Sequence, residues 1–222
     1  MTVVITGASG GIGSAAAKRF LSLGHDVVGI DLLPSSVRSP SYRHVIADIR
    51  DPDSLPEIPG VGVLFNNAGV QNGEDDIGTN LKGTMAVTET YIRDTSRLRS
   101  VLFNASASSV TGKEFPAYAA SKAGIVGYMK NVAVRLAPLG ITCNAISLGG
   151  VQTRLNDPVT SDPDLFRRIM DVTPMKKWMT ADEVADWVEF LTLRNRSMSG
   201  QNLLIDNGET DLNDTFVWPS AH

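Results

Sequence analysis

The chain has 222 residues, a net charge of −4, one cysteine and 20 glycines, and only 6% of its residues are aromatic. The acidic balance disfavours a nucleic-acid surface, which depends on Lys and Arg to neutralise phosphates, and no apolar run approaches the roughly 18 residues of a membrane span. The first residues lack the basic region of a secretory signal, and Cys143 alone cannot form an internal disulfide. The histidines at positions 25, 44 and 222 have no metal-ligand spacing. We therefore expect one cytoplasmic domain over residues 1–222, with no metal, nucleic-acid or membrane partner.

Short β-branched runs alternate with stretches of helical periodicity along the chain. Strands are expected at residues 3–5, 26–30, 45–46, 61–65, 101–103, 141–146 and 203–205. Helices are expected at residues 12–23, 79–93, 118–137 and 181–193, the last opening with a capping box formed by Thr180 and Glu183. Continuously apolar strands separated by helices are typical of a parallel sheet covered on both faces. The sequence thus predicts a doubly wound α/β domain, a Rossmann fold with three α/β/α layers.

A glycine-rich segment at residues 6–13 (TGASGGIG) follows the first strand and opens the first helix. In that context it fits a dinucleotide fingerprint. Its glycines would allow the tight turn, the close approach of backbone to pyrophosphate, and close packing of helix on strand. The N–H groups of the helix N-terminus would face the phosphates. The cofactor contacts predicted here are Gly7, Ser9, Gly10, Gly11, Ile12 and Gly13.

Asp31 stands at the end of the second strand, 18 residues after Gly13. An acidic residue at about this distance accepts hydrogen bonds from the adenosine ribose hydroxyls. It would also repel a 2′-phosphate, because two like charges about 4 Å apart cost up to roughly 4 kcal/mol at an effective dielectric constant near 20. Neither the glycine loop nor the residues just after Asp31 supply an Arg or Lys to offset that repulsion. The sequence therefore favours NAD, with NADP as the alternative.

Motifs further along the chain resemble, in order and over nearly the whole length, those of the short-chain dehydrogenases/reductases. They lie at residues 47–49 (ADI), 66–69 (NNAG), 80–83 (NLKG), 118–122 (YAASK), 144–153 and 200–208. The resemblance implies NAD(H)-dependent interconversion of a secondary alcohol and a ketone by a homodimer or homotetramer. An NADP-dependent carbonyl reductase and a non-catalytic NAD-binding sensor or scaffold are the alternatives. The resemblance also implies cofactor contacts from Asp48, Ile49, Asn67, Ala68, Gly69, Tyr118, Lys122, Gly149, Val151 and Thr153.

Tyr118 and Lys122 match the YxxxK signature of that family and, four residues apart, would share one face of a helix. A free tyrosine has a pKa near 10, too high for a base at neutral pH, and a neighbouring ammonium group favours the phenolate. Lowering that pKa by about 3 units requires about 4 kcal/mol. Tyr118 would then be the acid/base group. By the resemblance, Lys122 would also bind the nicotinamide ribose, and Asn80 would hold a water molecule in a proton relay.

The catalytic serine is less sharply defined by the sequence. The family places its serine one residue before Ser106, where this chain has Ala105. We predict that Ser106 binds the substrate oxygen and stabilises its developing charge, with Ser108 and Ser109 as competing candidates.

Other departures from the family pattern concern the walls of the cleft. Leu148 replaces a family proline, and the stretch between Gly69 and Asn80 is shorter than in the family, which predicts a more open cleft. Residues 154–177 are expected to form a mobile substrate loop and lid. Its apolar members slightly favour a hydrophobic substrate such as a hydroxysteroid, while sugar alcohols and hydroxy acids stay open; they are Leu155, Leu165, Phe166, Ile169, Met170 and Met175. The apolar tail at residues 215–219 is expected to pack on a neighbouring subunit or on its own core.

Overall fold

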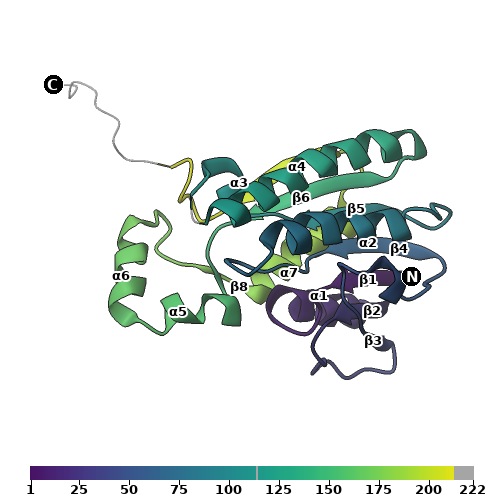
Figure 1. Cartoon of the computed structure of the whole chain (residues 1–222), viewed down its shortest axis with the longest axis horizontal. Coiled ribbons are helices and arrows are strands. Elements are labelled where there is room, and N and C mark those ends of the chain that lie inside the picture. The colour runs from purple at the N-terminus through teal and green to yellow at the C-terminus, as the bar shows by residue number, and fades with distance from the viewer. Residues whose placement is uncertain (114, 213–222) are drawn as a thin grey trace.

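A parallel sheet of seven strands, in the order β3-β2-β1-β4-β5-β6-β9, forms the centre of the molecule (Figure 1). The computed structural model describes residues 1–113 and 115–212, so the tail segment 215–219 lies outside the described residues. The strands are β1 (Thr2–Thr6), β2 (Asp26–Asp31), β3 (Tyr42–Ile46), β4 (Val61–Asn66), β5 (Ser100–Asn104), β6 (Thr142–Leu148) and β9 (Asn202–Ile205). A separate two-stranded ladder pairs β7 (Val151–Gln152) with β8 (Met179–Thr180).

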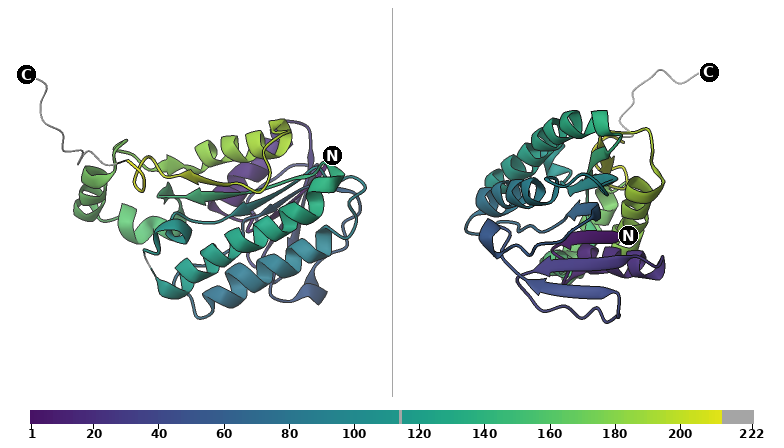
Figure 2. Two further views of the ribbon diagram at one scale, coloured as in Figure 1. Left: turned by 90° about the horizontal axis from the view of Figure 1, so that it is seen from above. Right: turned by 90° about the vertical axis from the view of Figure 1, so that its right-hand side faces the viewer.

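Helices cover both faces of this sheet (Figure 2). They are α1 (Gly11–Ser22), α2 (Thr84–Tyr91), α3 (Ser108–Thr111), α4 (Pro116–Leu136), α5 (Asp157–Thr160), α6 (Pro163–Val172) and α7 (Ala181–Glu189). Helices α2 and α4 lie on one face, and α1 and α7 lie on the other (Figure 2). This arrangement confirms the predicted doubly wound, three-layer α/β/α fold. Within the described residues, no helix is both long and apolar enough to cross a membrane.

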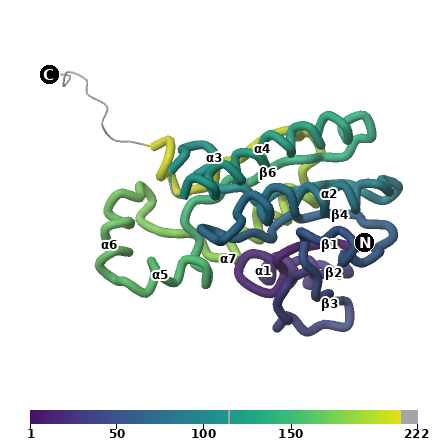
Figure 3. Tube along the Cα trace, in the orientation of Figure 1, coloured from purple at the N-terminus to yellow at the C-terminus, as the bar shows by residue number. Residues whose placement is uncertain are grey.

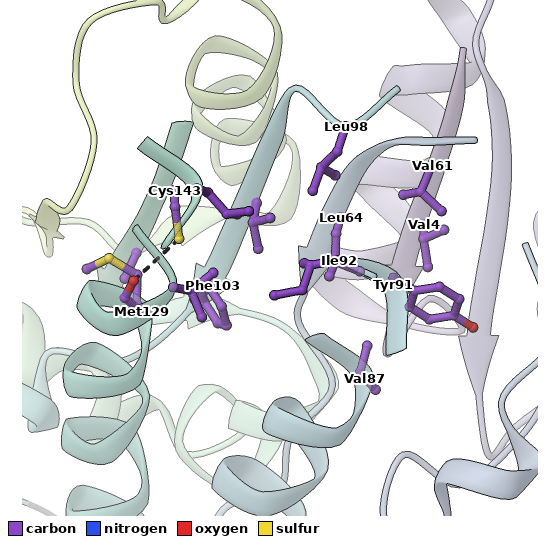
Figure 4. Packing of buried hydrophobic residues seen from close by; sticks show 14 of the residues in the cluster. Val4, Val61, Leu64, Val87, Tyr91, Ile92, Leu98, Phe103, Met129 and Cys143 are labelled. Atoms are coloured by element: carbon purple, nitrogen blue, oxygen red, sulfur yellow. Dashed lines mark hydrogen bonds between the residues drawn. The ribbon is translucent and has the colours of Figure 1, made fainter. Parts of the chain in front are cut away.

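The hydrophobic core has two parts, one on each face of the sheet, because successive side chains along a strand point in opposite directions. Val4, Leu64 and Phe103 pack with residues of α2 and α4 (Figure 4). Their sequence neighbours pack with residues of α1 and α7; examples are Val3, Phe65 and Leu102. Each of these side chains is fully or almost fully buried, and burying one of them contributes roughly 1.5–3 kcal/mol. Two continuous apolar layers therefore hold the strands rigidly, and the strand ends become fixed positions for the site.

The helix expected at residues 79–93 differs from the structure at its start. A π-helical turn, η2 (Ile77–Gly83), precedes α2 and contains Asn80. Such turns frequently mark functional positions. The helix expected at residues 181–193 likewise divides into α7 and a π-helical turn, η5 (Phe190–Arg194). The predicted capping box is confirmed, since Thr180 and Glu183 bond each other's backbone N–H groups.

The segment expected as a loop, residues 154–177, is largely helical. It contains a 3₁₀ turn, η4 (Arg154–Asn156), followed by α5 and α6. Helix α6 begins where the Asp162 carboxylate accepts hydrogen bonds from the N–H groups of Asp164 and Leu165, with Pro163 in the first turn. Both helices lie beyond the carboxyl ends of the strands, away from the main body (Figures 1 and 3). This is the edge of the sheet at which the cofactor loop and the YxxxK helix also meet.

Candidate active site

A cleft runs along the carboxyl ends of β2, β1, β4 and β5. It consists of three adjoining cavities of about 540, 860 and 370 Å³, called here the outer, middle and inner cavities. Ala68 and Gly69 line both the outer and the middle cavity, while Asn67 and Thr153 line both the middle and the inner one. Since the strand order reverses between β1 and β4, the cleft lies at the usual ligand position of a doubly wound sheet.

The glycine loop lines the middle cavity with backbone that only glycine adopts easily. Gly7 has φ +68° and Gly11 has φ +46°, both in the left-handed region that other residues rarely occupy. A Cβ atom on Gly13 would lie 2.0 Å from the carbonyl oxygen of Gly7, so the first turn of α1 packs directly against the end of β1. A Cβ on Gly10 would meet nothing within 4 Å. The loop is thus a bare backbone cradle at a helix N-terminus, and it fits a pyrophosphate group.

Asp31 lines both the outer and the middle cavity. Its Oδ2 accepts a hydrogen bond from the N–H of Ser9 and its Oδ1 accepts one from the N–H of Leu33, each at 2.9 Å. Asp48 and Ile49 line the same outer cavity, and their contact with the cofactor stays a prediction. These contacts fix the Asp31 carboxylate at the end of the cleft that would hold the adenosine.

Arg50 also lines the outer cavity and is a cation that the sequence analysis did not consider there. Its Nη2 lies 2.7 Å from Oδ2 of Asp48, and its Nε bonds both oxygens of that carboxylate. The guanidinium group lowers the pKa of Asp48. The guanidinium group of Arg50 is thus already engaged by Asp48 on the cavity that Asp31 also lines.

Tyr118 and Lys122 come together on the inner cavity, on one face of α4. The Nζ atom of Lys122 lies 5.7 Å from the centre of the Tyr118 ring and donates a 2.9 Å hydrogen bond to the carbonyl oxygen of Asn104, at the end of β5. A Cβ atom on Gly69 would lie only 3.3 Å from that Nζ. The NNAG glycine therefore leaves the space that the ammonium group occupies.

Lys122 is buried, and burial lowers its pKa from 10.5 to about 8. The buried carboxylate of Asp76 opposes this shift. Backbone N–H groups of Asn72 and Gly73 hold that carboxylate at 3.1 and 2.9 Å. At neutral pH the Lys122 amine stays protonated next to Tyr118, and its burial lowers the free energy of unfolding of the protein.

The three candidate serines occupy different positions relative to the inner cavity. Ser106 lines the inner cavity together with Tyr118, whereas neither Ser108 nor Ser109 does. Ser108 lies behind it and donates to the Oγ of Ser106 from both its N–H, at 3.2 Å, and its hydroxyl, at 2.9 Å. The Ser109 hydroxyl instead pairs with Ser147 at 3.0 Å. The geometry favours Ser106 as the serine that faces a substrate, with Ser108 supporting it.

The Asn80 side chain is fully buried and engaged by protein partners. Its Oδ1 accepts from the N–H of Val70 at 2.8 Å, and its Nδ2 donates to the Val70 carbonyl and to the hydroxyl of Ser121. These bonds tie the short loop after Gly69 to α4. The proton-relay role of Asn80 stays a prediction.

The opposite wall of the inner cavity comes from the chain after β6. Val151 and Thr153 line it, as does Gly149, where a Cβ atom would lie 2.7 Å from the Cβ of Asp206. The Thr153 methyl group lies 3.1 Å from where a Cβ on Gly11 would stand, so it closes over the glycine loop. These positions bring the predicted nicotinamide contacts to the inner end of the cleft.

Two further residues of the inner cavity were missed by sequence reasoning. Trp178 precedes the start of α7 and belongs to no motif, and Glu209 follows the motif at residues 200–208 without a pattern of its own. In the structure both line the inner cavity, and Nε1 of Trp178 donates a 3.0 Å hydrogen bond to Oε1 of Glu209. Among the described residues, no group of three or more His, Cys, Asp or Glu side chains is placed to hold a metal ion.

Known proteins resemble this chain along most of its length. Residues 59–210 match the family model described as "Enoyl-(Acyl carrier protein) reductase". The chain is 28% identical to a 3-oxoacyl-(acyl-carrier-protein) reductase of Buchnera aphidicola, over 93% of this chain and 96% of the relative. It is 31% identical to (+)-borneol dehydrogenase 1 of Salvia officinalis, over 95% and 94%. A solved structure of a Burkholderia thailandensis oxidoreductase from the short-chain dehydrogenase/reductase family is 28% identical over 94% and 92%, with a TM-score of 0.86.

The depressed pKa of Lys122 predicts how stability depends on pH. A change from 10.5 to about 8 corresponds to a cost of about 3 kcal/mol to the folded state at pH 7. Between these two values the unfolded chain binds more protons than the folded one, so the penalty is complete below pH 8 and disappears as the pH rises to 10.5. The free energy of unfolding of the wild type should therefore rise by up to about 3 kcal/mol relative to Lys122→Met over this range.

Urea unfolding at pH 7 and pH 10 measures this difference. Lys130→Met, on an exposed position of the same helix, is the matched control and should follow the wild type at both pH values. If Lys122→Met also runs parallel to the wild type, burial does not lower the Lys122 pKa.

Proposed function

The chain belongs to the short-chain dehydrogenase/reductase family and is an oxidoreductase, and we propose that it is an NAD(H)-dependent enzyme that interconverts a secondary alcohol and a ketone. One observation carries this proposal. Tyr118, Lys122 and Ser106 meet on an inner cavity that continues directly into the cleft of the glycine loop. The dehydrogenases and reductases among its relatives support the same reaction class.

The residues along the cleft fit a nicotinamide dinucleotide from end to end. The backbone at Gly7, Gly11 and Gly13 would cradle the pyrophosphate, and Asp31 would accept hydrogen bonds from the adenosine ribose. The nicotinamide end would then reach the inner cavity beside Thr153. When bound, the nicotinamide supplies or accepts the hydride of the reaction at its ring carbon C4.

Side chains of the inner cavity transfer the alcohol proton in the proposed reaction. The Ser106 hydroxyl holds the substrate oxygen by a hydrogen bond, and the Oη of Tyr118 takes the alcohol proton while the carbinol carbon loses its hydride. In the reverse direction Tyr118 returns the proton to the carbonyl oxygen. The Lys122 ammonium stabilises the phenolate form of Tyr118 electrostatically, because it stands near the ring inside a buried site with little water to screen it.

The position of Ser106 also argues against the alternative of a non-catalytic NAD-binding sensor or scaffold. A serine displaced by one position from the family pattern is the sequence feature that most favours a sensor or scaffold without turnover. Since Ser106 lies on the same cavity as Tyr118, the shift along the sequence leaves the catalytic group assembled.

Asp31 supports NAD over NADP. Its carboxylate is fixed by two backbone N–H groups, so it cannot swing away from a 2′-phosphate without losing both bonds. The cation on the same cavity, Arg50, is paired with Asp48. A 2′-phosphate at this position would therefore meet an anchored negative charge.

Replacing Tyr118 by Phe tests the assignment of the acid/base group. Tyr118→Phe should lower kcat by at least about a hundredfold, because general acid–base groups contribute typically 10²–10⁴-fold, while NADH binding changes little. The measurements are steady-state NADH consumption with a panel of ketones and NADH fluorescence titration. Tyr128→Phe is the matched control on the same helix, since the Tyr128 hydroxyl bonds Glu89 away from the cleft. A Tyr118→Phe enzyme that retains turnover contradicts the assignment.

Neutralising Asp31 tests the cofactor preference. The wild type should bind NADH at least about tenfold more tightly than NADPH, and Asp31→Asn should reduce that ratio at least about tenfold by removing the repulsion of the 2′-phosphate. Fluorescence titrations with both cofactors measure the ratio. Asp26→Asn, at the exposed opposite end of β2, should leave it unchanged. A wild type with equal or reversed preference would contradict the assignment of NAD.

A further inference from the structure

The inner cavity contains a carboxylate that the proposed reaction does not use. Glu209 lies on the turn after β9 and lines the same cavity as Tyr118 and Ser106. The Asp206 carboxylate holds the turn by accepting hydrogen bonds from the N–H groups of Gly208, at 3.0 Å, and Thr210, at 2.8 Å. The Glu209 N–H in turn bonds the Asp206 carbonyl at 3.2 Å. The backbone of Glu209 is therefore fixed relative to the end of the sheet.

The side chain is fixed through one oxygen only. Oε1 of Glu209 accepts a 3.0 Å hydrogen bond from the indole N–H of Trp178 and lies 2.9 Å from the fully buried Thr173 hydroxyl, whose single proton it shares with the Ile169 carbonyl at 2.8 Å. Over residues 1–113 and 115–212, neither a hydrogen bond nor an ion pair engages the other oxygen, Oε2. The carboxylate of this cavity-lining residue thus has one oxygen held by the protein and one oxygen without a partner among the described residues.

Trp178 adds a rigid aromatic wall beside this carboxylate. Its ring packs so closely on the chain that a Cβ atom at Gly150 would lie 2.0 Å from the indole. Phe166 of α6 meets the same ring edge-on, with ring centres 5.4 Å apart. Apolar side chains complete this side of the cavity, namely Leu155, Val159 and Ile169.

This combination selects a chemical class of substrate. A carboxylate oxygen accepts strong hydrogen bonds from hydroxyl groups, and it repels a substrate that carries its own carboxylate. The apolar and aromatic walls suit the C–H face of a ring. Of the apolar residues of segment 154–177 that favour a hydrophobic substrate in the sequence, only Leu155 and Ile169 line the inner cavity, and they share it with this carboxylate.

We propose that Glu209 is a specificity-determining residue that binds a second hydroxyl group of a neutral polyhydroxylated substrate, a sugar or cyclic polyol, with Trp178 against the sugar's C–H face. The proposal rests on the proposed dehydrogenase function and names its substrate class. Hydroxy acids are disfavoured, because their charge would lie in the same small cavity as the Glu209 carboxylate.

The test compares Glu209→Gln with the wild type on three probes: a set of neutral aldoses with myo-inositol, cyclohexanol as the alcohol without further hydroxyls, and D-gluconate as the anionic polyol. We expect the wild type to oxidise at least one neutral sugar or polyol with a higher kcat/KM than cyclohexanol and gluconate. Glu209→Gln should lower the ratio of kcat/KM for that sugar over cyclohexanol about 10- to 100-fold, mainly through KM, since a hydrogen bond to a charged group is lost. Asp182→Asn, which removes an exposed carboxylate from α7 and lies outside the cleft, should leave all three values unchanged.

A binding measurement separates this proposal from the proposed function. Calorimetric titration of the same sugars into NADH-loaded Tyr118→Phe protein, with and without Glu209→Gln, reports binding without turnover. Sugar binding that depends on Glu209, but with no turnover by the wild type, would sustain the role of Glu209 and overturn the dehydrogenase. Turnover of cyclohexanol or gluconate in preference to every neutral sugar, or a ratio unaffected by Glu209→Gln, would overturn the role of Glu209 and leave the dehydrogenase standing. If no neutral sugar binds, the role of Glu209 is likewise overturned, and the dehydrogenase assignment stands.

Discussion

The buried ammonium group of Lys122 constrains every part of the cleft around it. A charge in this position requires hydrogen-bond partners and opposite charge nearby, because burial removes its water. The structure supplies the carbonyl of Asn104 from the end of β5 and the carboxylate of Asp76 from the loop before η2. Gly69 leaves the space that Nζ needs. The end of β5, the loop before η2 and the turn at Gly69 thus surround Nζ of Lys122.

The same constraint explains how the rest of the site is arranged. Asn80 ties the loop after Gly69 to α4 through Val70 and Ser121, so the wall that faces Lys122 cannot move independently of the helix that carries it. Ser106 follows directly after β5, whose terminal carbonyl holds Lys122. The groups proposed to transfer the proton are therefore placed by rigid elements. The segments α5, α6 and the turn after β9 add the wall that would recognise a substrate.

The fold could be predicted from the sequence because its signals are local. Continuous β-branched runs, the glycine loop and the i, i+4 pair at Tyr118 and Lys122 each depend on residues close together in the chain. The extent of α6 could also have been predicted, since Asp162 followed by Pro163 is an ordinary helix start. The pairing of Trp178 with Glu209 could not, because the contact spans 31 residues and neither residue belongs to a motif. The place of Arg50 on the same cavity as Asp31 could not be predicted either, because it depends on the pairing of β2 with β3, which brings the segment after β3 to the end of β2.

We propose that the buried ammonium group of Lys122 makes Tyr118 a base near neutral pH. The direct measurement is a pH titration of tyrosinate absorbance in the NAD⁺-loaded protein, taken as the difference between the wild type and Tyr118→Phe. The account predicts one tyrosine that ionises near pH 7, about 3 units below the ordinary value, and a return toward the ordinary value in Lys122→Met. A Tyr118 that titrates at about 10 or above in the wild type would contradict it.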